Sequence, residues 1–205
     1  MVKRLKLNEI ATIRAGHTFR DPPEEARGSE ARILHIRDIK TRFNIDVSAL
    51  AEIEWNGGDK GVMQSGEIVV AARGLNNRAA WLAPSPNGER QERVIPSNQL
   101  LVLSINTNLK TASVLPEYLC WALNHVNAQR QINQRRTGTN IPMINKQDVS
   151  DIAIPVPTMG TQKRIIQLHK RHQHEHVLLE KLWENTDKMY QGLYQSLLTN
   201  VEKEN

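Results

Sequence analysis

Apolar residues in the first 157 positions fall into short runs separated by polar turns, a pattern typical of a mixed α/β (α+β) domain. Runs rich in β-branched residues and bounded by Gly, Pro or Asn predict strands. We expect strands at residues 33–36, 67–72, 79–83, 100–105 and 152–154, with 67–72 and 79–83 pairing antiparallel. The spacing of apolar residues predicts a short helix over residues 5–13, which Gly16 would close.

A second helix is expected from Pro116, because proline suits the first turn, where its missing N–H would be unpaired anyway. Leu119, Leu123 and Val126 recur at helical spacing and predict one apolar face. Basic side chains crowd the end of this helix: Arg130, Arg135 and Arg136. Residues 137–140 (Thr-Gly-Thr-Asn) should end it.

From residue 161 to about residue 199 the sequence predicts one long helix, interrupted only by a lone glycine at position 192. At 1.5 Å per residue it would be roughly 58 Å long, more than a small domain needs. Apolar residues at spacings of three and four form a stripe along it: Leu179, Leu182, Trp183, Met189, Tyr190, Leu193 and Leu197. The chain therefore divides into residues 1–157 and a helix over residues 158–205, and this stripe must pack on another helix.

Composition limits the class of protein. Of 205 residues, 39% are hydrophobic and 24% charged, as in ordinary globular proteins, and apolar stretches are too short to span a membrane. The polar N-terminal segment does not look like a signal peptide. The single cysteine, Cys120, excludes an internal disulfide framework and a multi-thiolate zinc site, so a cytoplasmic location is expected.

The positive charge is concentrated in the first part of the chain. The net charge is +5, and residues 161–205 hold seven basic and six acidic side chains, so 20 basic and 16 acidic ones precede them. Residues 118–147 contain no acidic residue. This favours a polyanionic partner such as nucleic acid. An ordinary solvated helix end would look the same, because helix C-termini favour cations.

Catalytic chemistry finds little support. Residues 21–24 (Asp-Pro-Pro-Glu) are similar to the Asp-Pro-Pro-Tyr loop of adenine methyltransferases, but Glu24 replaces the aromatic residue that stacks on a flipped base. Glycine-rich loops for S-adenosylmethionine or a nucleoside triphosphate are missing, as is a nucleophile elbow, so we expect no cofactor.

His169, His172 and His176 have spacings that a metal could bridge, but no set of acidic or thiolate ligands completes the site, so we expect a solvated face and no metal. Cys120 is expected to be a small buried side chain.

A binding surface is better supported, in the turn between the strands expected at 67–72 and 79–83. Arg73, Asn76, Asn77 and Arg78 offer guanidinium forks and amides, the groups that read guanine and adenine edges. The same residues suit a hairpin turn for backbone reasons alone.

Three pieces of sequence, in this order, carry a family resemblance. The first is residues 7–18, with Leu-Asn-Glu-Ile-Ala at 7–11 and Gly-His-Thr at 16–18. The second is residues 66–74, Gly-Glu-Ile-Val-Val-Ala-Ala-Arg-Gly. The third is Gly-Thr-Asn-Ile-Pro-Met-Ile-Asn at 138–145, then Ile-Ala-Ile-Pro-Val-Pro at 152–157 and Gln-Lys-Arg-Ile-Ile at 162–166. Together they resemble the specificity subunit of type I restriction–modification enzymes.

The resemblance covers the whole chain but only half of a typical family member. Such subunits carry two target recognition domains, each followed by a long helix, and the two helices pack antiparallel as a coiled coil. Each domain reads one half of a split DNA sequence. The subunit has no catalytic site, and methyltransferase subunits and a restriction subunit dock on it. The resemblance thus implies one target recognition domain, residues 1–157, and one spacer helix, residues 158–205.

Two departures from the family pattern are visible. Thr161 stands where an acidic residue commonly precedes the glutamine, and Glu67 replaces the usual aspartate. They leave the expected fold intact, but they leave open whether a methyltransferase subunit still docks.

The sequence therefore predicts a non-catalytic subunit that binds double-stranded DNA and pairs through its helix, as a homodimer about a twofold axis. Two alternatives remain open: a half-subunit that acts as a decoy on other specificity subunits, and, with least support, an adenine methyltransferase. Base or backbone contacts are expected from Arg73, Asn76, Asn77 and Arg78, and phosphate contacts from Arg135, Arg136, Thr137, Asn140 and Lys146. Weaker candidates are Arg37, Lys40 and Arg42, and the dimer seam is expected at Leu179, Leu182, Trp183, Met189, Leu193 and Leu197.

Overall fold

The computed structural model describes residues 2–39, 43–85, 92–106, 113–138 and 141–203. The chain divides into two compact units, residues 1–163 and residues 164–205. The candidate residues Lys40, Arg42 and Asn140 lie outside the described residues.

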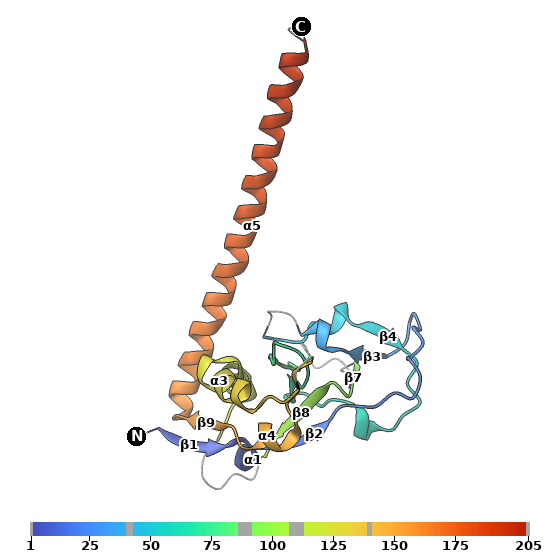
Figure 1. The fold of residues 1–205 in the computed structure, drawn as a ribbon, viewed down its shortest axis with the longest axis vertical. Helices are drawn as coiled ribbons and strands as arrows, with labels where there is room; N and C mark the ends of the chain where they lie inside the picture. Colours follow the sequence, from blue (N-terminus) through green and yellow to red (C-terminus); the bar gives the residue numbers. More distant parts are fainter. Residues whose placement is uncertain (1, 40–42, 86–91, 107–112, 139–140, 204–205) are drawn as a thin grey trace. The chain divides into compact units, whose positions relative to one another are not determined.

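The first unit contains both strands and helices, the mixed α/β composition that the sequence predicts (Figure 1). The strands are β1 (Lys3–Lys6), β2 (Ala11–Ala15), β3 (Ala31–Leu34), β4 (Ala51–Ile53), β5 (Ile68–Ala71), β6 (Ala79–Trp81), β7 (Arg93–Pro96), β8 (Leu100–Ile105) and β9 (Ala153–Val156). The α-helices are α1 (Leu7–Ile10), α2 (Pro116–Asn124), α3 (Val126–Arg135), α4 (Lys146–Ser150) and α5 (Met159–Lys203). Short 3-10 helices cover Ile36–Asp38, Val47–Ala49 and Asp59–Gly61.

The central sheet is antiparallel, with the strand order β2-β8-β5-β6. Every residue of β5 and β6 is buried, which explains why these strands are continuous apolar runs in the sequence. The register pairs Val70 with Ala79 and Ile68 with Leu103. The predicted strands at 67–72, 79–83 and 100–105, and the antiparallel pairing of the first two, are therefore confirmed.

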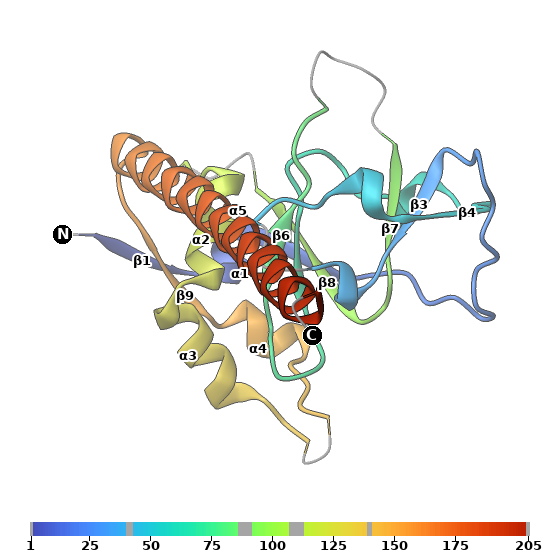
Figure 2. The same ribbon diagram turned by 90° about the horizontal axis from the view of Figure 1, so that it is seen from above.

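A second sheet has the order β4-β3-β7, in which β3 pairs parallel with β7 and antiparallel with β4. Its middle strand contributes to two clusters of core residues: Leu34 belongs to the larger cluster, shared with the central sheet, and Ile33 to a smaller one. Figures 1 and 2 place this sheet and the β1–β9 pair at opposite ends of the first unit. The sequence pattern predicts neither β4 nor β7.

The predicted helix over residues 5–13 is wrong for most of its length. Only Leu7–Ile10 form a helical turn, and it separates two strands. β1 pairs with β9, with Leu5 opposite Ile154, and β2 pairs with β8. Alternating burial in Ala11–Ala15 is the strand signal, and the apolar residues of the helical turn hid it by completing a helix-like spacing.

The helix predicted from Pro116 begins there but breaks at His125, which takes an extended backbone conformation between α2 and α3. Leu119 and Leu123 are fully buried, as expected. Val126 is 58% exposed, so it does not belong to the apolar face. After this break, Ala128 and Ile132 form the buried face of α3. Cys120 is buried, and burial raises the pKa of its thiol well above the ordinary value.

The predicted long helix is confirmed as α5, a single helix through the glycine at position 192 (Figure 1). Its first turn belongs to the first unit through Gln162, whose side chain is completely buried. The Gln162 amide accepts from Leu115 N at 2.9 Å and donates to the Ser113 and Pro157 carbonyls at 2.9 and 3.0 Å. Gln162 therefore joins the chain before α2, the end of β9 and the start of α5.

Candidate nucleic-acid interface

The turn between β5 and β6 protrudes as a hairpin tip, residues 72–78. Ala71 N donates to Arg78 O at 3.0 Å and closes the base of the turn. Gly74 has φ of +91°, a left-handed conformation that glycine adopts without strain. Four side chains of the tip are exposed: Arg73, Leu75, Asn76 and Arg78. Three of the four base-contact candidates are thus accessible at one turn.

The fourth candidate, Asn77, is a correction, because its side chain is 0% exposed. Its Nδ2 donates to Ala71 O at 2.6 Å, and its Oδ1 accepts from Arg136 Nε at 2.6 Å. Its carbonyl accepts from Gln129 Nε2 at 3.0 Å. A buried amide with these partners has no face left for a base, so Asn77 holds the hairpin tip in place.

Arg136 follows α3 and reaches across to the tip. Besides Asn77, its guanidinium donates from Nη2 to the carbonyl of Leu75. The side chain is half-buried, and both of its partners are neutral oxygen atoms. Arg136 therefore fixes the backbone of the tip and keeps its full positive charge. The neighbouring Arg135 folds back onto its own helix, donating to Gln131 O at 3.0 Å.

A second loop lies beside the tip. Thr137 and Met143 exchange backbone hydrogen bonds of 2.9 and 2.8 Å, closing a turn in which Gly138 has φ of +95°. Gly74 N donates to Pro142 O at 2.9 Å, and Ile144 N donates to Ala72 O at 2.9 Å. These bonds join the two loops into one surface, here called the two-loop platform: residues 72–78, 136–138 and 141–144.

The platform carries an uncompensated positive charge. None of its residues is acidic, and it contains three arginines. Within the described part of the chain, neither Arg73, Arg78 nor Arg136 forms an ion pair with a carboxylate. Guanidinium groups without a protein counter-ion attract phosphates and can donate in pairs to guanine.

The remaining candidates lie on or near the platform, with one exception. Thr137 is exposed within it, and Lys146 is exposed at the first position of α4, next to Asn145, which caps that helix by accepting from Asp148 N at 2.9 Å. Arg37 lies apart from it in the 3-10 helix Ile36–Asp38, beside Asp38. Sequence reasoning did not single out Gln129, Leu75 or Ile141, and Gln129 in particular gives no local signal of its contact with Asn77.

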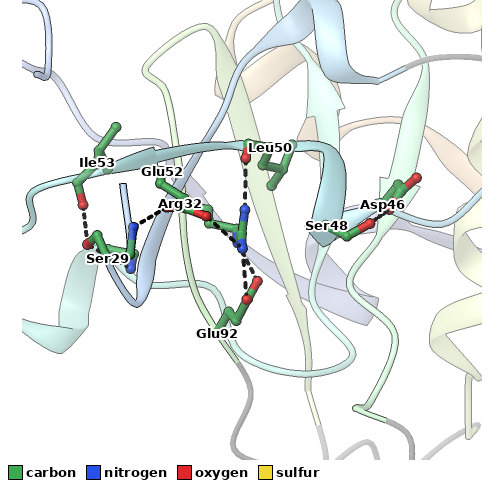
Figure 3. Close-up of polar contacts among 10 residues, drawn as sticks. Ser29, Arg32, Asp46, Ser48, Leu50, Glu52, Ile53 and Glu92 are labelled. Carbon is green, nitrogen blue, oxygen red and sulfur yellow. Dashed lines mark hydrogen bonds and ion pairs between the residues drawn. The ribbon is translucent and has the colours of Figure 1, made fainter. Parts of the chain in front are cut away.

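In contrast to the platform arginines, Arg32 is paired with carboxylates. Arg32, on β3, donates from Nε and Nη2 to the two carboxylate oxygens of Glu92 at 2.5 and 3.0 Å (Figure 3). Its Nη2 lies 3.3 Å from Glu52 Oε1, and its Nη1 donates to Leu50 O at 3.0 Å. The hydrogen bonds with Glu92 raise the pKa of Arg32 above its ordinary value. This group holds β3, β4 and the segment before β7 together.

The apolar stripe of α5 is exposed along its length. The candidate seam residues are all 50–77% exposed: Leu179, Leu182, Trp183, Met189, Leu193 and Leu197. No helix in the described ranges combines the length and apolar character that crossing a membrane requires. In those ranges no three His, Cys, Asp or Glu side chains are grouped to hold a metal ion.

Solved structures share this fold. They include the type I restriction–modification S subunit from M. genitalium, with 12% identity and a TM-score of 0.57, covering 85% of this chain and 39% of that chain. The HsdS subunit from Thermoanaerobacter tengcongensis has 14% identity and a TM-score of 0.62, over 87% and 39%. A chain from a structural study of complex assembly and conformational transition of the type I R-M system has 16% identity and a TM-score of 0.67, over 95% and 44%. The chain thus spans less than half the length of each.

No curated protein matches the chain. The family model of the type I restriction modification DNA specificity domain, however, matches residues 2–182, which include all of the first unit apart from Met1 and much of α5. The expectation drawn from the three sequence pieces is therefore confirmed: the chain belongs to the family of type I restriction–modification DNA specificity domains.

Proposed function

We propose that this chain reads one half of a bipartite DNA target through the two-loop platform, as a non-catalytic recognition subunit. One observation carries the proposal: two loops far apart in the sequence are fastened into one acid-free surface that presents Arg73, Asn76 and Arg78. Arginine and asparagine side chains on a fixed backbone can discriminate base edges in the major groove. In this proposal the exposed side chains of Thr137 and Lys146 contact the adjoining phosphates.

We further propose that α5 pairs antiparallel with the α5 helix of a second copy. The exposed stripe is long enough to be a liability in a monomer. A helix stripe that pairs with itself about a twofold axis restores two recognition domains from one gene product. The paired helices are also where a methyltransferase subunit, and through it a restriction subunit, would dock. The decoy function differs in needing a full-length specificity subunit as its partner.

DNA recognition is tested by selecting bound duplexes from a random pool, using the full chain with a methyltransferase subunit of the same restriction–modification system. A bipartite, twofold-symmetric consensus is expected. Arg78→Gln should relax discrimination at one base pair of each half-site by about 1–3 kcal/mol and leave other positions unchanged. A pool that returns without any consensus would contradict the recognition function.

Helix pairing is tested by sedimentation across a concentration series. The double variant Leu182→Glu/Leu193→Glu should dissociate the dimer, because each change buries an unpaired charge at a cost of several kcal/mol. The control is Gln191→Glu/Gln195→Glu, whose positions lie on the opposite face of α5 at about 100° per residue. A wild-type chain that remains monomeric at tens of micromolar, on the order of the concentrations used in such runs, would favour the heteromeric decoy.

A further inference from the structure

The platform presents an apolar side chain on a fixed backbone. Leu75 is 74% exposed, although its carbonyl accepts from Arg136 Nη2 and the preceding residue, Gly74, donates to Pro142 O at 2.9 Å. Hairpin tips usually carry polar residues, because water surrounds them. Here several hydrogen bonds fix the backbone, but the leucine side chain remains in contact with water. That arrangement suits a side chain held ready for a partner.

The second loop adds to the same apolar surface. Ile141 is 63% exposed and Met143 is 42% exposed. The backbone bonds between the loops, Gly74 to Pro142 and Ile144 to Ala72, place these residues beside the hairpin tip. Apolar and guanidinium groups are therefore combined on one face, with no acidic residue in either loop.

The charge of this face decides between possible partners. A groove on another protein would satisfy the apolar side chains, but it would need its own acidic groups to neutralise three arginines. The major groove of DNA supplies both features, since phosphates flank it and each thymine exposes a 5-methyl group there. Thymine methyl groups are the apolar contacts that a DNA-reading loop can make next to hydrogen-bonded base edges.

We infer that Leu75 packs against a thymine 5-methyl group, so that each half-site contains a thymine read by apolar contact; this rests on the proposed DNA-recognition function. Arg136 acts here as a positioning residue, because it fixes the Leu75 carbonyl. Ile141 borders the same contact from the second loop and shields it from water.

The test replaces thymine by deoxyuridine, which lacks only the methyl group, at one position of the selected duplex at a time. The whole chain is used together with a methyltransferase subunit, as in the selection experiment, and Kd is measured by fluorescence anisotropy. At one thymine per half-site the wild type should bind about fourfold more weakly, the effect expected for losing one buried methyl-sized group. Leu75→Ala should bind both duplexes equally.

Val126→Ala is the matched control, since Val126 is 58% exposed on α3 outside the platform and should keep the wild-type sensitivity. Retained discrimination between consensus and non-consensus duplexes, without any thymine that responds to loss of its methyl group, would overturn the leucine contact alone. That result would be obtained if the half-site contained no thymine. It would also be obtained if Leu75 inserted between neighbouring base pairs instead of contacting a methyl group. Equal binding of consensus and non-consensus duplexes by the wild type would instead contradict the proposed function.

Discussion

Arg32 and Arg136 are both fastened by side-chain hydrogen bonds to segments distant in sequence, yet their surroundings have opposite charge. Arg32 contacts two carboxylates, Glu92 and Glu52, and its side chain is 14% exposed. Arg136 contacts an amide oxygen and a carbonyl oxygen, and within the described residues it meets no carboxylate. A neutral acceptor fixes a guanidinium without cancelling its charge. The charge of Arg32 is therefore matched by carboxylates, whereas that of Arg136 has no carboxylate partner among the described residues.

On the proposed function, this difference distinguishes an arginine with a structural role, Arg32, from one that is available to a phosphate, Arg136. A buried or half-buried guanidinium attracts its counter-ion strongly because the local dielectric is low. If the side chain at position 136 only held the hairpin tip, a glutamine, or a lysine paired with a carboxylate, could do the same. The retained charge, beside Arg73 and Arg78, is understandable if phosphate groups approach the two-loop platform.

The largest expected effect comes from Arg136. Arg136→Gln keeps one donor for the hairpin tip but removes the charge, so DNA affinity should fall about tenfold or more, and the tip, held by fewer bonds, should also lose part of its base discrimination. If wild-type binding engages ~4–8 phosphates, its log K should slope against log salt by roughly −4 to −7, and the variant should lose about one unit of slope. Titrations at several salt concentrations measure both quantities.

The matched variant for this experiment is Arg136→Lys, which keeps the charge but replaces a planar fork by a single ammonium group. It should keep the wild-type salt slope while losing part of its base discrimination, because the tip is held by fewer bonds. Equal salt slopes for the Gln and Lys variants would show that the charge of Arg136 is not directed at DNA.

Arg32→Gln should show the reverse pattern. Removing the guanidinium leaves two carboxylates side by side, and it should lower the free energy of unfolding by about 1–3 kcal/mol. For a chain of this size that corresponds to a melting temperature lower by roughly 2–4 °C per kcal/mol. DNA affinity and salt slope should remain within about twofold of wild type, since Arg32 has no uncompensated charge. A lower salt slope for Arg32→Gln would break the comparison.

Much of this architecture was accessible from the sequence, since β5, β6, β8 and α5 are long or fully apolar segments whose periodicity is clear. The two short strands near the N-terminus could not be predicted, because the helical turn Leu7–Ile10 lies between them and the apolar spacing of the whole segment looks like that of one helix. β7 was missed because its parallel pairing with β3 depends on a contact between residues about sixty positions apart.

The location of the candidate site could be predicted from the sequence, but the roles of its individual residues could not. Residues 73–78 stood out as an Arg- and Asn-rich turn, and acid-free residues 118–147 stood out by charge. That the two segments join, that Asn77 faces inward, and that Arg136 supports the tip all depend on tertiary hydrogen bonds across more than fifty residues. Residue type alone assigns the same function to Asn76 and Asn77, whereas burial assigns them different ones.

The smallest expected effect concerns another ion pair, between Lys6 of β1 and Asp151 after α4, whose Nζ and Oδ1 atoms lie 2.8 Å apart. Both groups are open to solvent, so this pair should contribute less to stability than the Arg32 group does, and salt should weaken it. The hydrogen bond from Lys6 lowers the pKa of Asp151 below its ordinary value of 3.8, with a further contribution from Gln147. A lowered carboxyl pKa in the folded state adds stability that is complete above the unfolded pKa and is lost as the pH falls through the folded pKa. The same pair raises the pKa of Lys6 above 10.5, so its contribution is lost again when the pH rises through that higher value. Melting temperatures of wild type and Asp151→Asn should therefore differ slightly near neutral pH, begin to converge below about pH 4, where Asp151 becomes protonated in the unfolded chain, and meet only below the lower pKa of the folded state. A difference that persists unchanged in acid would mean that Asp151 acts through packing or capping and not through its charge.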